Sequence, residues 1–207
     1  FFKQKTAYEI PKRDWSSDVC SSDLIVASSN PVRNVTVDEL QRIWLGDITD
    51  WSRLGGRSGA IVPVLPPLSS DLSRAFVQRV LEGRDMKAAS IVEASDSAVA
   101  ERVASLPGAM GVVSLPVAAH RGVRALAVSP LVGLPYVEPD LQSVHDGGYP
   151  LTRFVNLYIR TRGARLAGGF VTFVSSQPGQ ELVLDHGLLP TAVPIRFVHR
   201  SPMLGSH

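Results

Sequence analysis

The chain has 207 residues, of which 44% are hydrophobic and 19% charged, and its formal net charge at pH 7 is +2. This composition is typical of one or two globular domains, and the apolar stretches are too short and too often broken by Gly, Pro or charge to span a membrane. The weak net charge and scattered basic residues do not indicate nucleic-acid binding. The five histidines lie far apart and no acidic pairs repeat, so neither a metal site nor a cofactor is predicted.

The first 24 residues, FFKQKTAYEIPKRDWSSDVCSSDL, differ from the rest of the chain. They lack the apolar stretch of a secretory signal, contain acidic residues that a transit peptide avoids, and carry Cys20 with no histidine nearby. The stretches KQKTAYEI and DWSSDVCSSDL resemble the in-frame translation of a sequencing-library adapter. We therefore interpret residues 1–24 as a non-native, adapter-derived segment, give Trp15 and Cys20 no mechanistic role, and expect the segment to pack poorly against the body.

The body begins with a short predicted strand, Ile25 to Ala27, that runs into a turn. The stretch TVDELQRIWLG predicts a helix, because Thr36 and Glu39 form a capping-box pattern, apolar residues recur on one face, and Gly46 can end it. A strand is predicted over 61–65.

Predicted strands and helices continue to alternate along the rest of the chain. A second capped helix, SSDLSRAFVQRVLEG, follows the Pro66-Pro67 pair and ends at Gly83. Further strands are predicted in IVEA, AMGVVSL, VRALAV and LTRFVNLYIRT, and further helices in SDSAVAERVASLPG, GARLAGGFVTFVSS and QPGQELVLDHG. Strands that alternate with helices indicate an α/β fold with sheets covered mostly on both faces.

Motifs of catalysis and nucleotide binding are absent. The patterns GxGxxG, GxxxxGK[ST] and GxSxG do not occur, so no dinucleotide, nucleoside triphosphate or serine-hydrolase site is predicted. Ser69, His145 and Asp146 have no supporting local signature as catalytic residues and are interpreted as loop or cap residues. The sequence does not predict an enzyme.

Five stretches, taken in order, resemble one family. They are VDELQRIWLGDITDWSRLGG, IVPVLPPLSSDLSRAFVQRVLEG, LPGAMGVVSL, SVHDGGYPLTRFVNLYIR and FVTFVSSQPGQELVLDHGLLPT. Together they cover most of residues 25–191, and they are similar to the substrate-binding proteins of bacterial phosphate ABC uptake systems and their short phosphate-binding-protein-like relatives. The spacing between the stretches also resembles that of the family.

This resemblance implies an α/β, type II periplasmic-binding-protein-like fold: two α/β lobes with a cleft, the first lobe being incomplete. Residues 60–130 would form the inner lobe, residues 25–59 plus 131–200 the partial outer lobe, and residues 201–207 a tail. The implied function is that of a solute-binding protein of a bacterial ABC importer. It would bind phosphate or a similar small oxyanion between the lobes, meet an ABC permease, and be periplasmic or extracellular.

The candidate ligand-binding residues lie at the start of the second helix, where free backbone N–H groups favour an anion. The family usually has an Arg, three residues and then Ser-Gly-Thr here. Pro66 stands in place of the Arg, and only Ser70 of the Ser-Gly-Thr is retained.

The candidates are therefore Ser69, Ser70, Asp71 and Arg74. Asp71 is unfavourable beside an anion unless it turns away or is protonated, and Arg74 could supply a cation instead. Ser70 could equally be a plain N-cap and Arg74 a solvated surface residue.

The family also places a strand, a Gly/Ser-rich turn and a helix before the position of residue 25. We therefore expect a truncated gene product that binds its ligand weakly or not at all. The alternative function is that of a degenerate binding-fold domain that acts as a sensor or protein-interaction module without binding phosphate.

Overall fold

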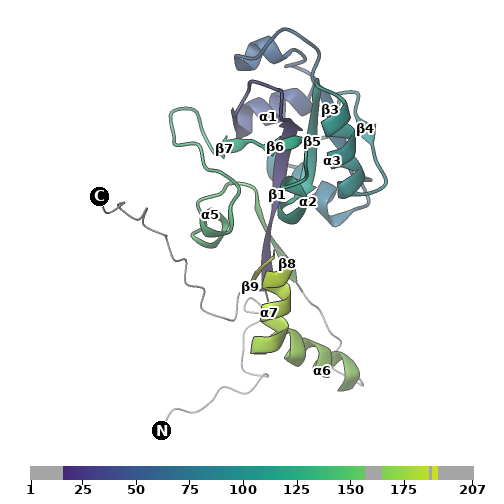
Figure 1. Ribbon diagram of the computed structural model, residues 1–207, viewed down its shortest axis with the longest axis vertical. Helices are drawn as coiled ribbons and strands as arrows, with labels where there is room; N and C mark the ends of the chain where they lie inside the picture. The colour runs from purple at the N-terminus through teal and green to yellow at the C-terminus, as the bar shows by residue number, and fades with distance from the viewer. Residues whose placement is uncertain (1–15, 157–164, 187, 191–207) are drawn as a thin grey trace, which may run out of the picture.

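The computed structural model describes residues 16–156, 165–186 and 188–190. The fold consists of a larger and a smaller body, and the long strand β1 (Ser16–Ala27) runs from the smaller body into the larger one (Figure 1). The second half of β1 pairs antiparallel with β5 (Ala109–Ser114) and β6 (Val123–Ala125) of the larger body. Its first half pairs antiparallel with β8 (Thr152–Asn156) and β9 (Leu189–Pro190) of the smaller body. One strand therefore belongs to both bodies.

The extent of β1 corrects, for residues 16–24, the expectation that the segment 1–24 packs poorly. The strand begins at Ser16, so the predicted strand Ile25–Ala27 is only its end. Residues 16–24 pair with β8, β9 and β5, and the side chains of Asp23 and Leu24 are fully buried. Because paired strands on both sides satisfy the backbone groups of this segment, it is an integral part of the sheet. Residues 1–15 lie outside the described residues.

The sheet of the larger body has the order β4-β3-β5-β1-β6. Strands β3 (Val62–Leu65) and β4 (Ile91–Val92) run parallel to β5, whereas β1 is antiparallel to it. The carboxyl ends of β3, β4 and β5 therefore lie at one edge. Ser22 of β1 is opposite Ser114, the last residue of β5, so this edge is the one nearest the smaller body.

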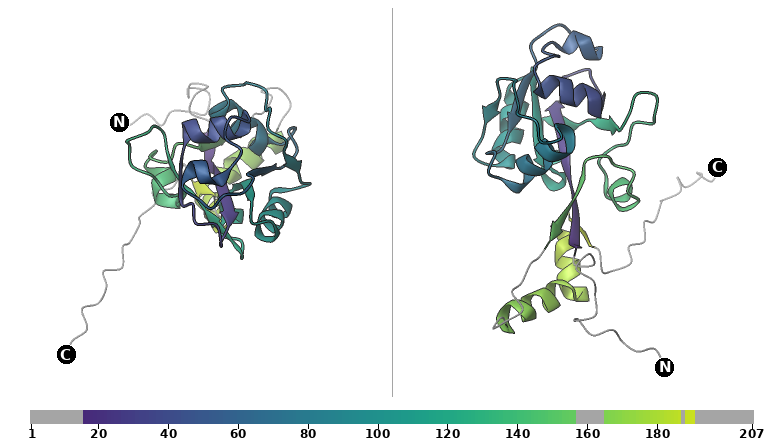
Figure 2. Two further views of the ribbon diagram at one scale, coloured as in Figure 1. Left: turned by 90° about the horizontal axis from the view of Figure 1, so that it is seen from above. Right: turned by 180° about the vertical axis from the view of Figure 1, so that it is seen from behind.

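Helices cover both faces of this sheet (Figure 2). On one face lie α1 (Val37–Trp44) and α2 (Asp71–Val80), and on the other lie α3 (Asp96–Ser105) and α4 (Leu115–Ala118). The predicted capping box of α1 is confirmed, because the Glu39 N–H donates to the Thr36 hydroxyl at 3.2 Å and the Thr36 N–H donates to the Glu39 carboxylate at 2.8 Å.

The core follows the alternation of side chains along β1. Leu24 and Val26 point to the face covered by α1 and α2, and Ile25 points to the face covered by α3 and α4. The apolar cluster on the face covered by α1 and α2 continues past the end of the sheet toward the smaller body. The residues of this continuation are Val144, Tyr149, Leu151 and Leu189.

Helix α1 and the short 3₁₀-helix η1 (Trp51–Leu54) pack directly on the segment 60–130. The rings of Trp44 and Phe76 lie 4.8 Å apart between centroids, and the indole N–H of Trp51 donates to the Gly108 carbonyl at 3.0 Å. The Trp51 side chain is buried. The lobe boundaries inferred from the sequence stay a prediction, and these contacts join residues 37–54 to the larger body.

The smaller body contains β8, β9, α6 (Arg165–Val174) and α7 (Gln177–Asp185), as Figure 1 shows. Between the bodies lies the short helix α5 (Leu141–His145). A two-stranded parallel sheet of β2 (Asn34–Thr36) and β7 (Ala127–Ser129) flanks the larger body. No helix of the described residues is both long enough and apolar enough to cross a membrane.

Two glycines in the stretches that resemble the family are required by close packing of the chain around them. A Cβ on Gly111 of β5 would lie 2.7 Å from Val103 and 2.8 Å from Val99, so the glycine lets α3 approach the sheet closely. A Cβ on Gly179 would lie 2.1 Å from the Phe173 carbonyl oxygen, at the junction of α6 and α7. These motifs therefore specify packing.

Candidate functional site

Three helices of the larger body begin at the edge where the parallel strands end. Helix α2 starts after Ser70 and follows β3, α3 starts after Ser95 and follows β4, and α4 starts after Ser114 at the end of β5. In open α/β sheets ligands bind outside the carboxyl ends of the strands. This edge is therefore the candidate site, and it faces the smaller body.

The loop that leads into α2 is held in place by its own hydrogen bonds. The Ser70 hydroxyl accepts from the Ser73 N–H at 3.2 Å, and the Ser70 N–H donates to the Pro67 carbonyl at 2.8 Å. The hydroxyl of Ser73, a fully buried residue, donates to the Pro66 carbonyl at 2.8 Å. The first turn of α2 is thus fixed against the end of β3, and it presents backbone N–H groups there.

The structure places the four predicted residues together on this loop and first turn. Ser69 is exposed, and Ser70 is the half-buried N-cap, as the alternative interpretation held. Asp71 and Arg74 are both exposed and form an ion pair with each other. Their part in binding a ligand stays a prediction.

The start of α3 is a second part of this edge that was not predicted as a site. The Ser95 hydroxyl caps α3 by accepting from the Ala98 N–H at 3.2 Å. The carboxylate of Asp96 accepts from the Ser114 hydroxyl at 2.5 Å and from the Ser97 N–H at 3.1 Å. The sequence predicted a helix in SDSAVAERVASLPG, but it is the parallel pairing of β3 and β4 that places the start of this helix at the same edge as the start of α2.

The charges of the edge are balanced locally. The starts of α2 and α3 carry the carboxylates of Asp71 and Asp96 respectively, where the helix dipole favours negative charge. Arg74 pairs with Asp71, and the carboxylate of Glu93 pairs with Arg102 at 2.7 Å. An anion at this edge would depend on backbone N–H groups and serine hydroxyls, because the nearby cations already have carboxylate partners.

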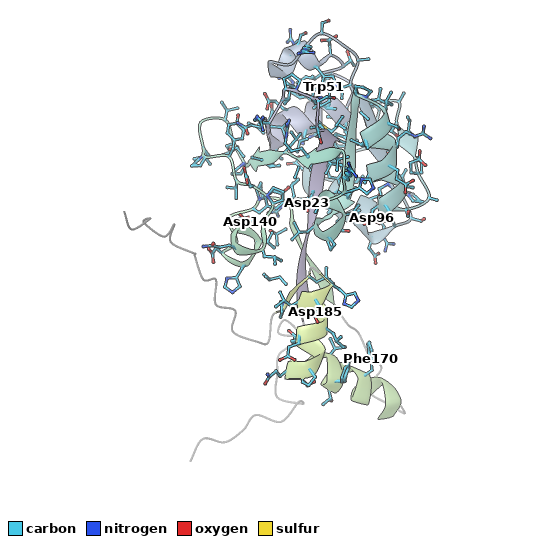
Figure 3. All side chains as sticks on the ribbon, viewed as in Figure 1. Asp23, Trp51, Asp96, Asp140, Phe170 and Asp185 are labelled. Atoms are coloured by element: carbon cyan, nitrogen blue, oxygen red, sulfur yellow. The ribbon has the colours of Figure 1, made fainter. Side chains whose placement is uncertain are left out.

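A buried polar pair lies where the chain passes between the bodies. Figure 3 shows Asp23 in the larger body, near the end that faces the smaller one, where it pairs with Val113 of β5. Asp23 and Tyr149 are both almost completely buried. Burial, together with the neighbouring Asp23 carboxylate, raises the pKa of the Tyr149 hydroxyl well above its ordinary value of 10.0. The pair joins β1 to the segment that enters β8.

Two bodies that share strand β1, with helix starts at the edge between them, form the bilobal arrangement of a periplasmic-binding-protein-like fold. Residues 8–178 match the family model of the PBP superfamily domain, so the chain belongs to this family.

Relatives of known name support the assignment. The chain is 31% identical over 170 residues to the phosphate-binding protein PstS of Bacillus subtilis, a match that covers 80% of this chain and 54% of that protein. It is 24% identical over 218 residues to the phosphate-binding protein PstS of Pseudomonas aeruginosa strain PAO1, covering 91% of this chain and 62% of that protein. The chain thus spans less than two thirds of the length of these relatives.

Solved structures confirm the α/β, periplasmic-binding-protein-like fold. One from Clostridium perfringens, described as a phosphate ABC transporter substrate-binding protein with bound phosphate, superposes with a TM-score of 0.73 at 25% identity, covering 84% of this chain and 70% of that one. An ABC-type phosphate transport receptor from Vibrio cholerae has a TM-score of 0.73 at 22% identity, covering 91% and 78%. The names of these relatives are those of binding proteins rather than enzymes.

Proposed function

We propose that this protein is a solute-binding component of a bacterial ABC importer and that it holds phosphate or a similar small oxyanion at the start of α2. The observation that carries the proposal is the geometry of this helix start. A loop fixed by Ser70 and Ser73 presents the other first-turn N–H groups, those of Asp71 and Leu72, at the carboxyl edge of a parallel sheet. Such a helix start is suited to an anion through its N–H groups and its dipole.

The relatives support the ligand class. Those from Bacillus subtilis and Pseudomonas aeruginosa are named as phosphate-binding proteins, and the Clostridium perfringens structure is described with bound phosphate. The alternative of a sensor or interaction module without phosphate binding finds no support among these names. We infer that the protein acts by binding and not by catalysis.

The proposed residue roles follow from position. The Ser69 hydroxyl and the N–H groups of the first turn of α2 would contact the oxyanion, and Ser70 would hold that turn in shape. Arg74 would draw the Asp71 carboxylate away from the anion, since the two side chains pair on the outer surface of the helix. At the start of α3 the N–H groups of Ser97 and Ala98 already donate to Asp96 and Ser95, so this helix start would act on the oxyanion mainly through its dipole.

The proposal also includes the protein partner and the cellular location. An ABC permease would be the protein partner, and the location would be periplasmic or extracellular. Because the chain spans 54% of the Bacillus subtilis relative, we expect it to supply only part of the contacts that the ligand receives. Its affinity for phosphate on its own should therefore be weak.

Isothermal titration of the 207-residue chain with sodium phosphate tests the function. We expect saturable binding with a dissociation constant of about 1 mM, which corresponds to a binding free energy of about −4 kcal/mol. Sodium chloride at equal ionic strength is the control. Absence of saturable binding would overturn the proposed function, whereas a micromolar or tighter constant would confirm the ligand and contradict the expected weakness.

A further inference from the structure

A pocket of about 260 Å³ lies at the opposite edge of the sheet, far from the starts of α2 and α3. It opens where β1 ends and where β3 and β5 begin. Its walls are the segments 29–31, 57–59 and 107–108, and Trp51 completes the lining. Figure 3 shows Trp51 at the end of the larger body that points away from the smaller body and from Asp23 and Asp96. The pocket is therefore separate from the proposed oxyanion site.

One wall of the pocket is held rigid by the carboxylate of Asp50. This carboxylate accepts from the Ser52 N–H at 2.8 Å, from the Gly59 N–H at 3.0 Å and from the Ser58 hydroxyl at 3.4 Å. Hydrogen bonds from Ser52, with smaller contributions from Gly59 and Ser58, lower the pKa of Asp50. The carboxylate is thus ionised at neutral pH and fixes the 50–60 loop, so the pocket is formed before any ligand arrives.

The Trp51 side chain, which forms the aromatic part of the pocket lining, is also fixed in place. Trp51 is only 4% exposed, and its indole N–H is already used on the Gly108 carbonyl at 3.0 Å. The ring therefore offers a packed apolar surface but no open face on which a nucleic-acid base could stack.

The loops around the pocket are strongly basic. They and the adjacent start of β6 carry five arginines against two acids, and the arginines are Arg33, Arg53, Arg57, Arg121 and Arg124. The acids are Asp47 and Asp50, and Asp50 is already engaged in the loop. Of these five, Arg124 alone is engaged with another described residue, since it donates to the Asn30 and Val32 carbonyls at 2.7 and 2.6 Å.

Arg57 is the cation inside the pocket lining. It is exposed, and among the described residues its side chain forms neither an ion pair nor a hydrogen bond. A free guanidinium presents a fork of N–H donors that matches the two oxygens of a carboxylate. Its charge is reinforced by the surrounding arginines, which would draw a negatively charged partner to this edge.

From this geometry we propose that the Arg57 pocket is a docking site for an acidic segment of a partner protein, with one carboxylate seated on Arg57. The occupant is inferred from charge complementarity and from size, since the volume suits one or two residues rather than a drug-sized ligand. A bilayer surface is flat and would meet the loop tips, whereas Arg57 lines a recess. The proposal does not depend on oxyanion binding at α2.

Fluorescence anisotropy with a labelled peptide of alternating glycine and glutamate tests this site, and the same peptide with glutamine in place of glutamate is the matched probe. We expect the glutamate peptide to bind the full chain at least tenfold more tightly than the glutamine peptide. Arg57→Ala should weaken that binding at least tenfold. The control Arg84→Ala removes an exposed arginine next to the end of α2 and should change it less than twofold.

Each other outcome overturns the proposal. Equal binding of the two peptides would show that carboxylates are not recognised. Equal losses in the Arg57 and Arg84 variants would show attraction by overall charge without a pocket. Displacement of the peptide by single-stranded DNA or by vesicles of anionic lipid at lower concentration than by unlabelled peptide would assign the basic edge to a different class of partner.

Discussion

The carboxylate of Asp71 pairs with the guanidinium of Arg74 on the first turn of α2, at the centre of the proposed oxyanion site. The pair lies in solvent, with side chains that are 81% and 66% exposed respectively. Exposed ion pairs contribute little to stability, so its main effect is on the local potential. It leaves the helix start nearly neutral where phosphate would need a positive field.

Replacement of Asp71 by Asn should therefore strengthen phosphate binding. The substitution removes a negative charge from the helix start and releases Arg74, and we expect a gain of about two- to tenfold in affinity. Isothermal titration measures the effect, and it should shrink as ionic strength rises. Asp85→Asn, which removes an exposed acid beyond the far end of α2, is the matched control and should leave the affinity unchanged. Weaker binding by the Asp71 variant would mean that this carboxylate contacts the ligand favourably.

Gly111→Ala should destabilise the larger body. The added Cβ would lie 2.7 Å from Val103, 2.8 Å from Val99 and 3.1 Å from Ile25, all in the core on the α3 face of the sheet. Overpacking of this kind costs about 1–3 kcal/mol. Chemical denaturation gives the free energy of unfolding. Gly59→Ala is the control, because a Cβ there meets nothing within 4 Å, and equal stability of the two variants would contradict the packing at Gly111.

The buried Tyr149 should make the protein sensitive to alkali. Its pKa in the folded state is raised by burial and by Asp23, so the neutral phenol contributes stability that is present below the unfolded pKa of 10.0 and lost as pH rises through the folded pKa. In Tyr149→Phe, stability should fall less steeply above pH 10.0. Thermal unfolding followed across that range is the measurement. Tyr136→Phe, at a residue 46% exposed, is the comparison, and parallel slopes for the two variants would refute the burial effect.

Gly169→Ala should stabilise the smaller body. Gly169 lies inside α6, is exposed, and has open space where its Cβ would be. Alanine favours a helix interior over glycine by about 1 kcal/mol. Hydrogen exchange at the α6 amides should slow accordingly. Unchanged or faster exchange would contradict the helical environment of this residue.

The sequence predicted well those features that local chemistry determines. The capping box at Thr36 and Glu39 and the helix that begins after Ser70 both follow from residue patterns within a few positions. The four candidate residues of α2 were grouped correctly on one helix start for the same reason.

The features that the sequence did not predict depend on contacts between segments that are distant in the chain. The polar stretch before Ile25 has no strand-like pattern of its own, and it becomes part of β1 because β5, β8 and β9 supply partners for its backbone. The second helix start at Ser95 joins the site only through the parallel pairing of β3 with β4. The Arg57 pocket combines loops that are far apart in sequence, so no local motif could have indicated it.

The most direct test of the central claim is a phosphate titration of the isotope-labelled chain followed by amide NMR at constant ionic strength. We expect saturable shifts concentrated at residues 69–74 and at 95–98, the starts of α2 and α3, with little change around Arg57. Saturable shifts confined to another part of the molecule, or no saturable shift at either helix start, would contradict it.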